Sequence, residues 1–325
     1  GSISVQREKD WVMPWRIDFE HYDFYPFLTD SVAKECSGVR LAFASDTQKL
    51  SLELAESGEG QTLDLFVNDS FAQRVVLQEQ SLEVQFQALQ AGLKNIEIWL
   101  DPAFSFKLKS IKIDDTARIS KIINTKKRWV HYGSSISHCK LTNDSIDEGR
   151  APSKIWPALV AQKMNLHLTN LGFSGNCKLE SMIARIIRDL DADYITLKLG
   201  INLHAEDLTE RTFAPGVIGF IQIIREKHPY TPIALISPIY CPYREETKGE
   251  KSGLSLQDMR KIHQRVVEIC KKYGDTNIYY VDGLKIFGKT ELNYMPDQLH
   301  PNAKGQPVLA ENFIREVFYR LPCHV

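Results

Sequence analysis

Apolar and polar residues alternate in short runs between positions 39 and 113. The clearest of these runs are 50–54, 63–67, 95–100 and 109–113. A period of two is typical of strands that bury one side and expose the other. Turn-forming residues separate the runs, as at 57–60 and 68–70. Many short strands of this kind predict an antiparallel β-sandwich.

The pattern changes from Arg128 onward, where short apolar strands alternate with segments of helical periodicity. The predicted strands are 129–132, 166–171, 194–199, 233–236 and 278–281, and the predicted helices are 153–164, 179–190, 215–227, 256–273 and 303–318. Ser153 is expected to cap the first helix, and Ser255 and Asp258 form a capping box for the fourth. This alternation predicts an α/β fold with a parallel sheet covered on both faces. The functional site of such a sheet lies beyond the carboxyl ends of its strands.

The length of the chain adds a prediction about domains. A chain of 325 residues exceeds a typical single core. We therefore expect a β-sandwich domain over residues 1–120 and an α/β domain over residues 121–325, with the junction in 115–127.

Composition and charge exclude several classes of partner. The chain is 43% hydrophobic and 25% charged, which is ordinary for a globular protein, and its formal net charge is -1. This balance gives no reason to expect nucleic acid or an anionic membrane as a partner. The longest apolar helix candidate, 217–224, is far shorter than a membrane span and is interrupted by Gly219 and Gln222. We expect a cytoplasmic protein; because Gly1 and Ser2 resemble the remnant of a cleaved tag, a natural leader upstream of them is the alternative.

Cysteines and histidines give no metal or redox motif. The six cysteines are scattered without a C-x-x-C pair, and they are Cys36, Cys139, Cys177, Cys241, Cys270 and Cys323. Free thiols in a reducing compartment are the expectation for such a set. His131, His138 and His204 lie near the segments discussed next, but none of them has a partner at metal-ligand spacing. We therefore predict no metal and no organic cofactor.

Four segments fall where the site of the predicted sheet should lie. Three of them, 132–136, 170–176 and 199–202, follow the first three strands, and the fourth, 297–301, precedes the last helix. Parallel strands would gather all four at one edge of the sheet.

These segments contain the groups that acyl transfer requires. Ser135 is the candidate nucleophile, His300 the candidate general base and Asp297 the residue that orients His300. The candidate oxyanion donors are the backbone N–H groups of Ser135 and Gly175 and the side-chain amide of Asn202. Taken singly, each of these residues is typical of a turn or a helix cap. The full set, in this order and at strand ends, predicts a serine-dependent site.

The four segments resemble the SGNH/GDSL hydrolases, whose motif order is Ser, Gly, Asn and then Asp-x-x-His. The resemblance covers about residues 127–321 and implies a flavodoxin-like three-layer α/β/α domain with a Ser-His-Asp triad. Two positions depart from the family pattern. Ser134 replaces the usual aspartate before the nucleophile, and Leu203 follows Asn202 where an aspartate is common. Neither departure removes a catalytic group, and both indicate a side branch of the family.

A second resemblance involves residues 237–242, the pair Arg244-Glu245 and the pair Met259-Arg260. These resemble a group of GDSL-like proteins with an N-terminal β-sandwich, which includes esterases and a polyketide acyltransferase. Carbohydrate acetyl esterases of the SGNH clan carry an N-terminal jelly roll, so the analogy implies a jelly-roll-like, carbohydrate-binding-like accessory domain.

The resulting functional hypothesis is a carboxylic-ester hydrolase that removes a short acyl group, acetyl above all, from a small molecule or a carbohydrate. The alternatives are an acyltransferase with the same triad and a non-catalytic carbohydrate-binding protein. Short acyl groups are expected because the loop 238–253 is charged and polar rather than apolar. Four aromatic residues, Tyr132, Phe173, Tyr240 and Tyr243, are candidates for lining the pocket, with core packing as the alternative for Phe173.

Overall fold

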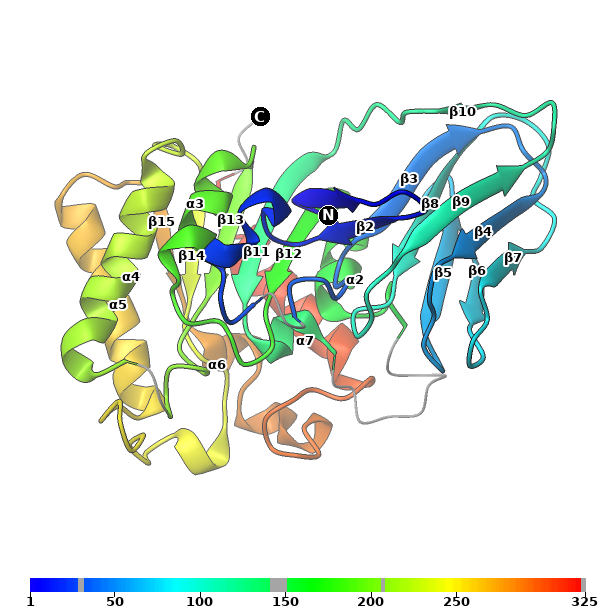
Figure 1. The fold of residues 1–325 in the computed structure, drawn as a ribbon. Coiled ribbons are helices and arrows are strands. Elements are labelled where there is room, and N and C mark those ends of the chain that lie inside the picture. The colour runs from blue at the N-terminus through cyan, green and yellow to red at the C-terminus, as the bar shows by residue number, and fades with distance from the viewer. Residues whose placement is uncertain (29–31, 141–150, 206–207, 323–325) are drawn as a thin grey trace.

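A computed structural model describes residues 1–28, 32–140, 151–205 and 208–322. Two antiparallel sheets form the N-terminal part, and a parallel sheet flanked by helices forms the rest (Figure 1). The N-terminal strands are β1 (Ser4–Arg7), β2 (Val12–Trp15), β3 (Arg40–Ser45), β4 (Leu50–Leu54), β5 (Thr62–Val67), β6 (Ser70–Val76), β7 (Glu83–Phe86), β8 (Lys94–Leu100), β9 (Leu108–Ile113) and β10 (Ile119–Ser120). Their orders are β1-β2-β9-β4-β7 in one sheet and β10-β3-β8-β5-β6 in the other. The predicted β-sandwich is therefore confirmed.

Alternation of side chains builds the sandwich core. In β4, Leu50, Leu52 and Leu54 are buried while the residues between them are half-buried. The residues that face inward form a hydrophobic cluster separate from the core of the parallel sheet. The turn between β5 and β6 is made by Asn68 and Asp69, which have φ of 48° and 63°. Both values lie in the left-handed region that Asn and Asp tolerate, so the predicted turn has its expected chemistry.

The parallel sheet has the strand order β12-β11-β13-β14-β15, which is the flavodoxin-like order. Its strands are β11 (Lys127–Gly133), β12 (Leu166–Gly172), β13 (Tyr194–Lys198), β14 (Ile233–Ile236) and β15 (Ile278–Val281). Its helices are α1 (Ser135–His138), α2 (Trp156–Lys163), α3 (Ser181–Asp189), α4 (Glu210–Arg225), α5 (Leu256–Lys272), α6 (Gly283–Ile286) and α7 (Gly305–Phe313). Helices α2 and α7 pack together on one face, and α3, α4 and α5 pack on the other (Figure 1). The chain thus has the predicted three-layer α/β/α fold.

Three short segments complete the α/β part. The 3₁₀ turns Pro242–Arg244 and Lys289–Tyr294 lie in the loops after β14 and α6, and a π-helical turn, Ile314–Phe318, extends α7. In the N-terminal part, a further 3₁₀ segment, Phe19–Phe24, follows β2.

Two helix starts differ from the sequence prediction. Ser153 does not cap α2; its hydroxyl instead donates to Asp64 Oδ2 of β5 at 2.5 Å, and Ile155 occupies the N-cap. Helix α4 begins at Glu210 rather than at Pro215, because Thr209 and Thr212 form a capping box and the helix tolerates Pro215 in its interior. The capping box of Ser255 and Asp258 at α5 is confirmed.

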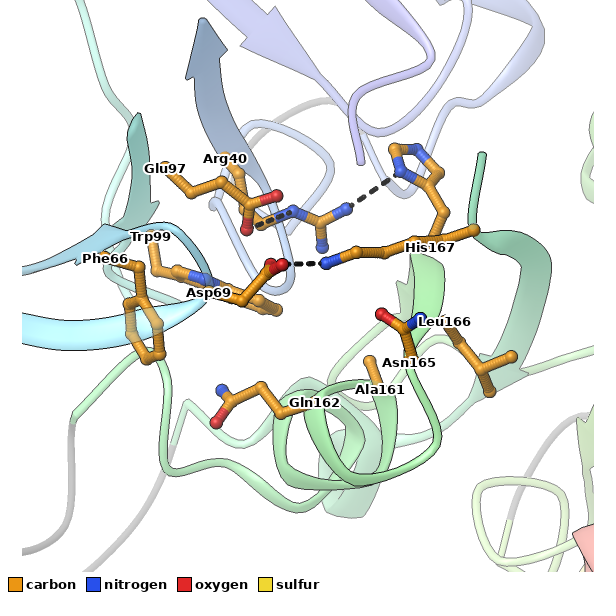
Figure 2. Close-up of a pocket in the computed structure, with 11 residues that line it drawn as sticks. Arg40, Phe66, Asp69, Glu97, Trp99, Ala161, Gln162, Asn165, Leu166 and His167 are labelled. Atoms are coloured by element: carbon orange, nitrogen blue, oxygen red, sulfur yellow. Dashed lines mark hydrogen bonds and ion pairs between the residues drawn. The ribbon is translucent and has the colours of Figure 1, made fainter. Parts of the chain in front are cut away.

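The sandwich contacts the α/β part directly, and one small cavity of about 60 Å³ lies between them. Figure 2 shows Arg40, Glu97 and Trp99 on the sandwich side of this cavity and Gln162, Asn165 and His167 on the other side. Asn165 and His167 flank the amino end of β12, so the cavity lies at the edge of the parallel sheet opposite to the one predicted to carry the site.

Two further expectations concern cysteines and membranes. Five of the six cysteines are buried free thiols, as predicted, while Cys323 lies outside the described residues. Among the described residues, no helix combines the length and apolarity needed to cross a membrane.

Candidate active site

The first element of the site is the turn from β11 into α1. Ser134 is the N-cap of α1, and its Oγ accepts a hydrogen bond from the Ile136 amide at 3.3 Å. Ser135 is the first residue of the helix and is half-buried, whereas Ser134 is fully buried. The Ser134 hydroxyl therefore caps the helix, whereas Ser135 presents its hydroxyl at the helix start.

The second element is the segment before α7, which brings His300 and Asp297 to Ser135. His300 Nε2 lies 2.8 Å from Ser135 Oγ, and His300 Nδ1 lies 2.6 Å from Asp297 Oδ2. Because a carboxylate only accepts, Nδ1 carries the proton and Nε2 is free to accept the proton of the serine hydroxyl. The structure thus brings together all three residues predicted as a triad.

Asp297 is itself held by the backbone of its own turn. Its Oδ1 accepts from the amides of His300 at 2.7 Å and Leu299 at 3.0 Å. Partial burial alone would raise the pKa of Asp297, but these hydrogen bonds together with that from the His300 ring hold it below its ordinary value. Asp297 therefore remains ionised and keeps the His300 ring in one orientation.

The third element is a set of hydrogen-bond donors that have no acceptor. Among the described residues, none accepts a hydrogen bond from the amides of Ser135 and Gly175 or from Asn202 Nδ2. Asn202 Oδ1 accepts from the Cys177 amide at 3.2 Å, which directs Nδ2 of the same amide elsewhere. Gly175 has φ of +72°, a left-handed conformation that favours glycine. Free, fixed donors of this kind suit an oxyanion.

A second serine–histidine pair lies directly beneath the first. Ser137 Oγ is 2.8 Å from His131 Nε2, and His131 Nδ1 is 2.7 Å from Thr196 Oγ1. All three residues are fully buried, and burial lowers the pKa of His131 to about 3. Because it is fully buried, this pair is closed to substrate.

The other histidines near the site in sequence are also buried. His138 and His204 both have pKa values lowered by burial. Over the described part of the chain, no group of three or more metal-binding side chains comes together.

The four aromatic candidates divide into two kinds. Tyr132 and Phe173 are fully buried, so they belong to the core rather than to a pocket. Tyr132 stacks on Phe220 with ring centroids 5.2 Å apart. Tyr240 is half-buried, and Tyr243 is 45% exposed on the loop after β14. Burial, and then the neighbouring Cys241, raise the pKa of Tyr243, and the charge of Asp297 makes a smaller contribution in the same direction.

Sequence reasoning missed three side chains that hold the site loops. Arg244 Nη1 donates to the Ile201 carbonyl at 3.1 Å, next to Asn202. Gln306 Nε2 donates to the Pro301 carbonyl at 2.9 Å, next to His300. Arg16 Nη1 donates to the Gly172 carbonyl at 2.6 Å, at the end of β12. Of the three, Arg244 belongs to a motif named in the sequence analysis. Arg16 and Gln306 belong to none, and Arg16 bonds to a residue far away in the sequence.

Comparisons with known proteins can now be set beside this geometry. The sequence profile of the GDSL-like Lipase/Acylhydrolase family matches residues 126–317, and that of the SsfX3 N-terminal domain matches residues 1–109. No curated protein sequence matches the chain.

Solved structures match over nearly the whole length. The salicylyl-acyltransferase SsfX3 from a tetracycline biosynthetic pathway is 33% identical with a TM-score of 0.86, and the match covers 98% of this chain and 93% of that one. A putative GDSL-like lipase from Bacteroides ovatus is 20% identical with a TM-score of 0.74, covering 98% and 94%. A family two carbohydrate esterase from Clostridium thermocellum is 15% identical with a TM-score of 0.68, covering 88% and 93%. The last two likenesses concern the fold alone.

Proposed function

The chain belongs to the GDSL-like lipase/acylhydrolase family and is an enzyme that acts on esters, and from this premise we propose that it is a serine ester hydrolase with Ser135 as its nucleophile. His300 is the general base and Asp297 orients it. The observation that carries the proposal is the unbroken hydrogen-bond chain from Asp297 through His300 to Ser135 at the start of α1.

The proposed reaction proceeds through an acyl-enzyme. Ser135 Oγ attacks the ester carbonyl carbon while its proton passes to His300 Nε2. The negative charge on the carbonyl oxygen is accepted by the amides of Ser135 and Gly175 and by Asn202 Nδ2. As the ester C–O bond breaks, the leaving alcohol takes the proton from His300. Water then repeats the sequence, giving its proton to His300, releasing the acid and restoring the Ser135 hydroxyl.

The test is acetate release from p-nitrophenyl acetate by the wild type and by Ser135→Ala and His300→Ala. Members of a triad act as a unit, so each substitution should lower kcat by about 10⁴-fold or more. Ser137→Ala is the matched control, because it removes a serine hydroxyl from the same helix. Retention of more than a tenth of wild-type kcat by either triad variant would exclude the assignment.

Acyl transfer is the second candidate function. It is favoured by the 33% identity to a structure described as a salicylyl-acyltransferase, over 98% of this chain. In this alternative the acyl-enzyme is the same, but an acceptor alcohol replaces water. Adding a primary alcohol or a sugar to the p-nitrophenyl acetate reaction separates the two. A hydrolase releases acetate in proportion to p-nitrophenol, whereas a transferase diverts most acetyl groups to the acceptor.

The proposed substrate is an ester of a short acyl group, acetyl above all, with a small-molecule or carbohydrate alcohol. Two observations support this class. The loop between β14 and α5 carries many charged residues, and it presents the half-exposed ring of Tyr243 close to Asp297. An exposed tyrosine ring can pack on a sugar or a small acyl group, whereas a long acyl chain needs an extended apolar surface. The sandwich is proposed as an accessory domain of the carbohydrate-binding kind.

A further inference from the structure

A fully buried arginine of the sandwich part reaches the loops of the site. Arg16 lies just after β2, which crosses to the side of β12 (Figure 1). Its Nη1 donates to the carbonyls of Gly172 at 2.6 Å and Asn170 at 3.3 Å, both near the end of β12. Its Nε and Nη2 donate to the carbonyls of Glu35 and Val32 at 2.6 and 2.5 Å. One guanidinium therefore joins the backbone of the N-terminal part to the strand that leads to Gly175.

His138 makes a second connection from the nucleophile helix. It lies three residues after Ser135 in α1 and is fully buried. Its Nδ1 accepts from the Ser174 amide at 3.2 Å, so Nε2 carries the ring proton and donates to the Pro102 carbonyl at 2.8 Å. His138 thus links α1 to the residue before Gly175 on one side and to the sandwich on the other.

The orientation of the Gly175 amide depends on these contacts. The Ser174 N–H is held by His138, and the Ser174 carbonyl accepts from Asn176 Nδ2 at 2.8 Å. Gly172 packs so closely on α1 that an added Cβ would lie 2.5 Å from the backbone nitrogen of His138. The turn therefore has few ways to move once Arg16 and His138 are in place.

We propose that Arg16 and His138 are positioning residues, which hold the amides of Ser135 and Gly175 at the separation that an oxyanion requires. The inference rests on the proposed function, because it assumes that these two amides bind the oxyanion. Neither side chain touches substrate. Their effect should be on the stabilisation of the transition state rather than on the binding of the ester.

The electrostatics of His138 agree with this role. Burial, and then the charge of Arg16, hold the pKa of His138 well below its usual range. The lowered pKa favours the neutral ring, in which Nδ1 accepts from the Ser174 amide while Nε2 faces the Pro102 carbonyl and the Glu35 carboxylate.

The first test compares two arginines that connect the sandwich to the same strand. Arg16 holds the carboxyl end of β12, whereas Arg40 contacts its amino end through His167 and the Leu168 carbonyl (Figure 2 shows the contact with His167). Arg16→Lys keeps the charge but cannot reach all four carbonyls. It should lower kcat by about 10- to 100-fold, since misplacement of about 1 Å is enough for that, with KM changed less than about threefold. Arg40→Lys, the matched control, should leave kcat within about twofold at a comparable loss of Tm.

The second test replaces His138 by Asn or by Gln. The side-chain amide of each residue reaches the position of one of the two ring nitrogens. Asn places an acceptor near Nδ1 for the Ser174 amide, whereas Gln reaches the Nε2 position near the Pro102 carbonyl. We expect His138→Asn to retain most of kcat and His138→Gln to lose it. A trifluoromethyl ketone that forms a tetrahedral adduct with the serine should lose affinity in each variant by the same factor as kcat/KM.

Three outcomes overturn the inference. They are a fall in kcat that is equal for Arg16→Lys and Arg40→Lys, an effect on KM alone, and equal activity of the two His138 variants. If Arg16→Lys does not fold, the His138 pair decides the question. Failure of the proposed function is separate: Ser135→Ala would then keep its activity, whereas failure of this inference alone leaves Ser135→Ala inactive and gives one of these three outcomes.

Discussion

Three serines lie within four residues at the end of β11, and their surroundings differ. Ser134 is buried and bonded to the Ile136 amide, Ser137 is buried against His131, and Ser135 is half-buried against His300. We predict that a fluorophosphonate labels Ser135 alone, because only this hydroxyl combines access with a base. Peptide mass spectrometry of the labelled protein checks the position. Ser137→Ala should still be labelled, and an adduct on Ser134 or Ser137 of the wild type would refute the assignment.

The acid side of the pH–rate profile should report a single histidine. Protonation of His300 removes the acceptor for the Ser135 proton, so kcat/KM should fall on the acid side of the profile. The buried histidines do not contribute there: the pKa of His131 is about 3, and that of His138 lies well below its usual range. Asp297, with a lowered pKa, stays ionised until still lower pH. Measured profiles should therefore fit one ionisation, and a rate that is flat from pH 8 to about pH 4.5 would exclude a histidine base.

Three of the residues that the sequence identified share one property. Ser135, Gly175 and Asn202 each follow a strand of the parallel sheet, so their meeting follows from the topology alone. Arg16 and Gln306 do not share it. Their partners are backbone carbonyl groups, 156 residues away for Arg16 and five residues away for Gln306, and residue types do not predict which backbone carbonyl a side chain will reach.

At the scale of elements, hydrophobic periodicity predicted the strands whose bounds are determined by the burial of apolar residues. The strand β14 was predicted with its observed bounds, because all four of its residues are apolar and buried. Errors occurred where a side chain had a choice of partners. Ser153 could cap α2 or bond to Asp64, and it bonds to Asp64, a residue of the other part of the chain. The strands β1 and β2 were not predicted individually, because neither is a continuous apolar run: β1 contains Gln6 and Arg7, and β2 contains Pro14.

The loop between β14 and α5 carries a prediction about substrate. Its charged side chains and the exposed ring of Tyr243 offer little apolar area to a long acyl chain. We therefore expect kcat/KM to be higher for p-nitrophenyl acetate than for the octanoate. Tyr243→Ala should raise KM for the preferred ester and leave kcat within about threefold, because the role proposed for the ring is to contact substrate and not the reacting atoms. A higher kcat/KM for the octanoate would contradict the short-chain assignment.

At the scale of the molecule, one carboxylate joins the two parts of the chain. Asp64 of β5 is fully buried and pairs with Arg74 of β6 at 2.7 Å. The same carboxylate accepts from the amide and the hydroxyl of Ser153, just before α2, at 3.0 and 2.5 Å. The sandwich and the α/β part are therefore joined by two hydrogen bonds from Ser153 to a buried, ion-paired carboxylate, in addition to the contacts of Arg16. We expect them to unfold together rather than separately.

The last prediction tests this coupling with two aspartates of the sandwich. Asp64→Asn places an amide where Ser153 and Arg74 both require an acceptor. It should lower the free energy of unfolding by about 3 kcal/mol, the order of cost of breaking a buried pair. Asp69→Asn is the matched control: Asp69 also reaches across, to Lys126 at 2.5 Å, but its side chain is 65% exposed. An exposed pair contributes little because water screens it, so this variant should unfold like the wild type. Differential scanning calorimetry of the full chain should show one transition, shifted to lower temperature in Asp64→Asn only. Two separate transitions in the wild type would show that the two parts unfold independently, and equal shifts in the two variants would show that the coupling does not depend on Asp64.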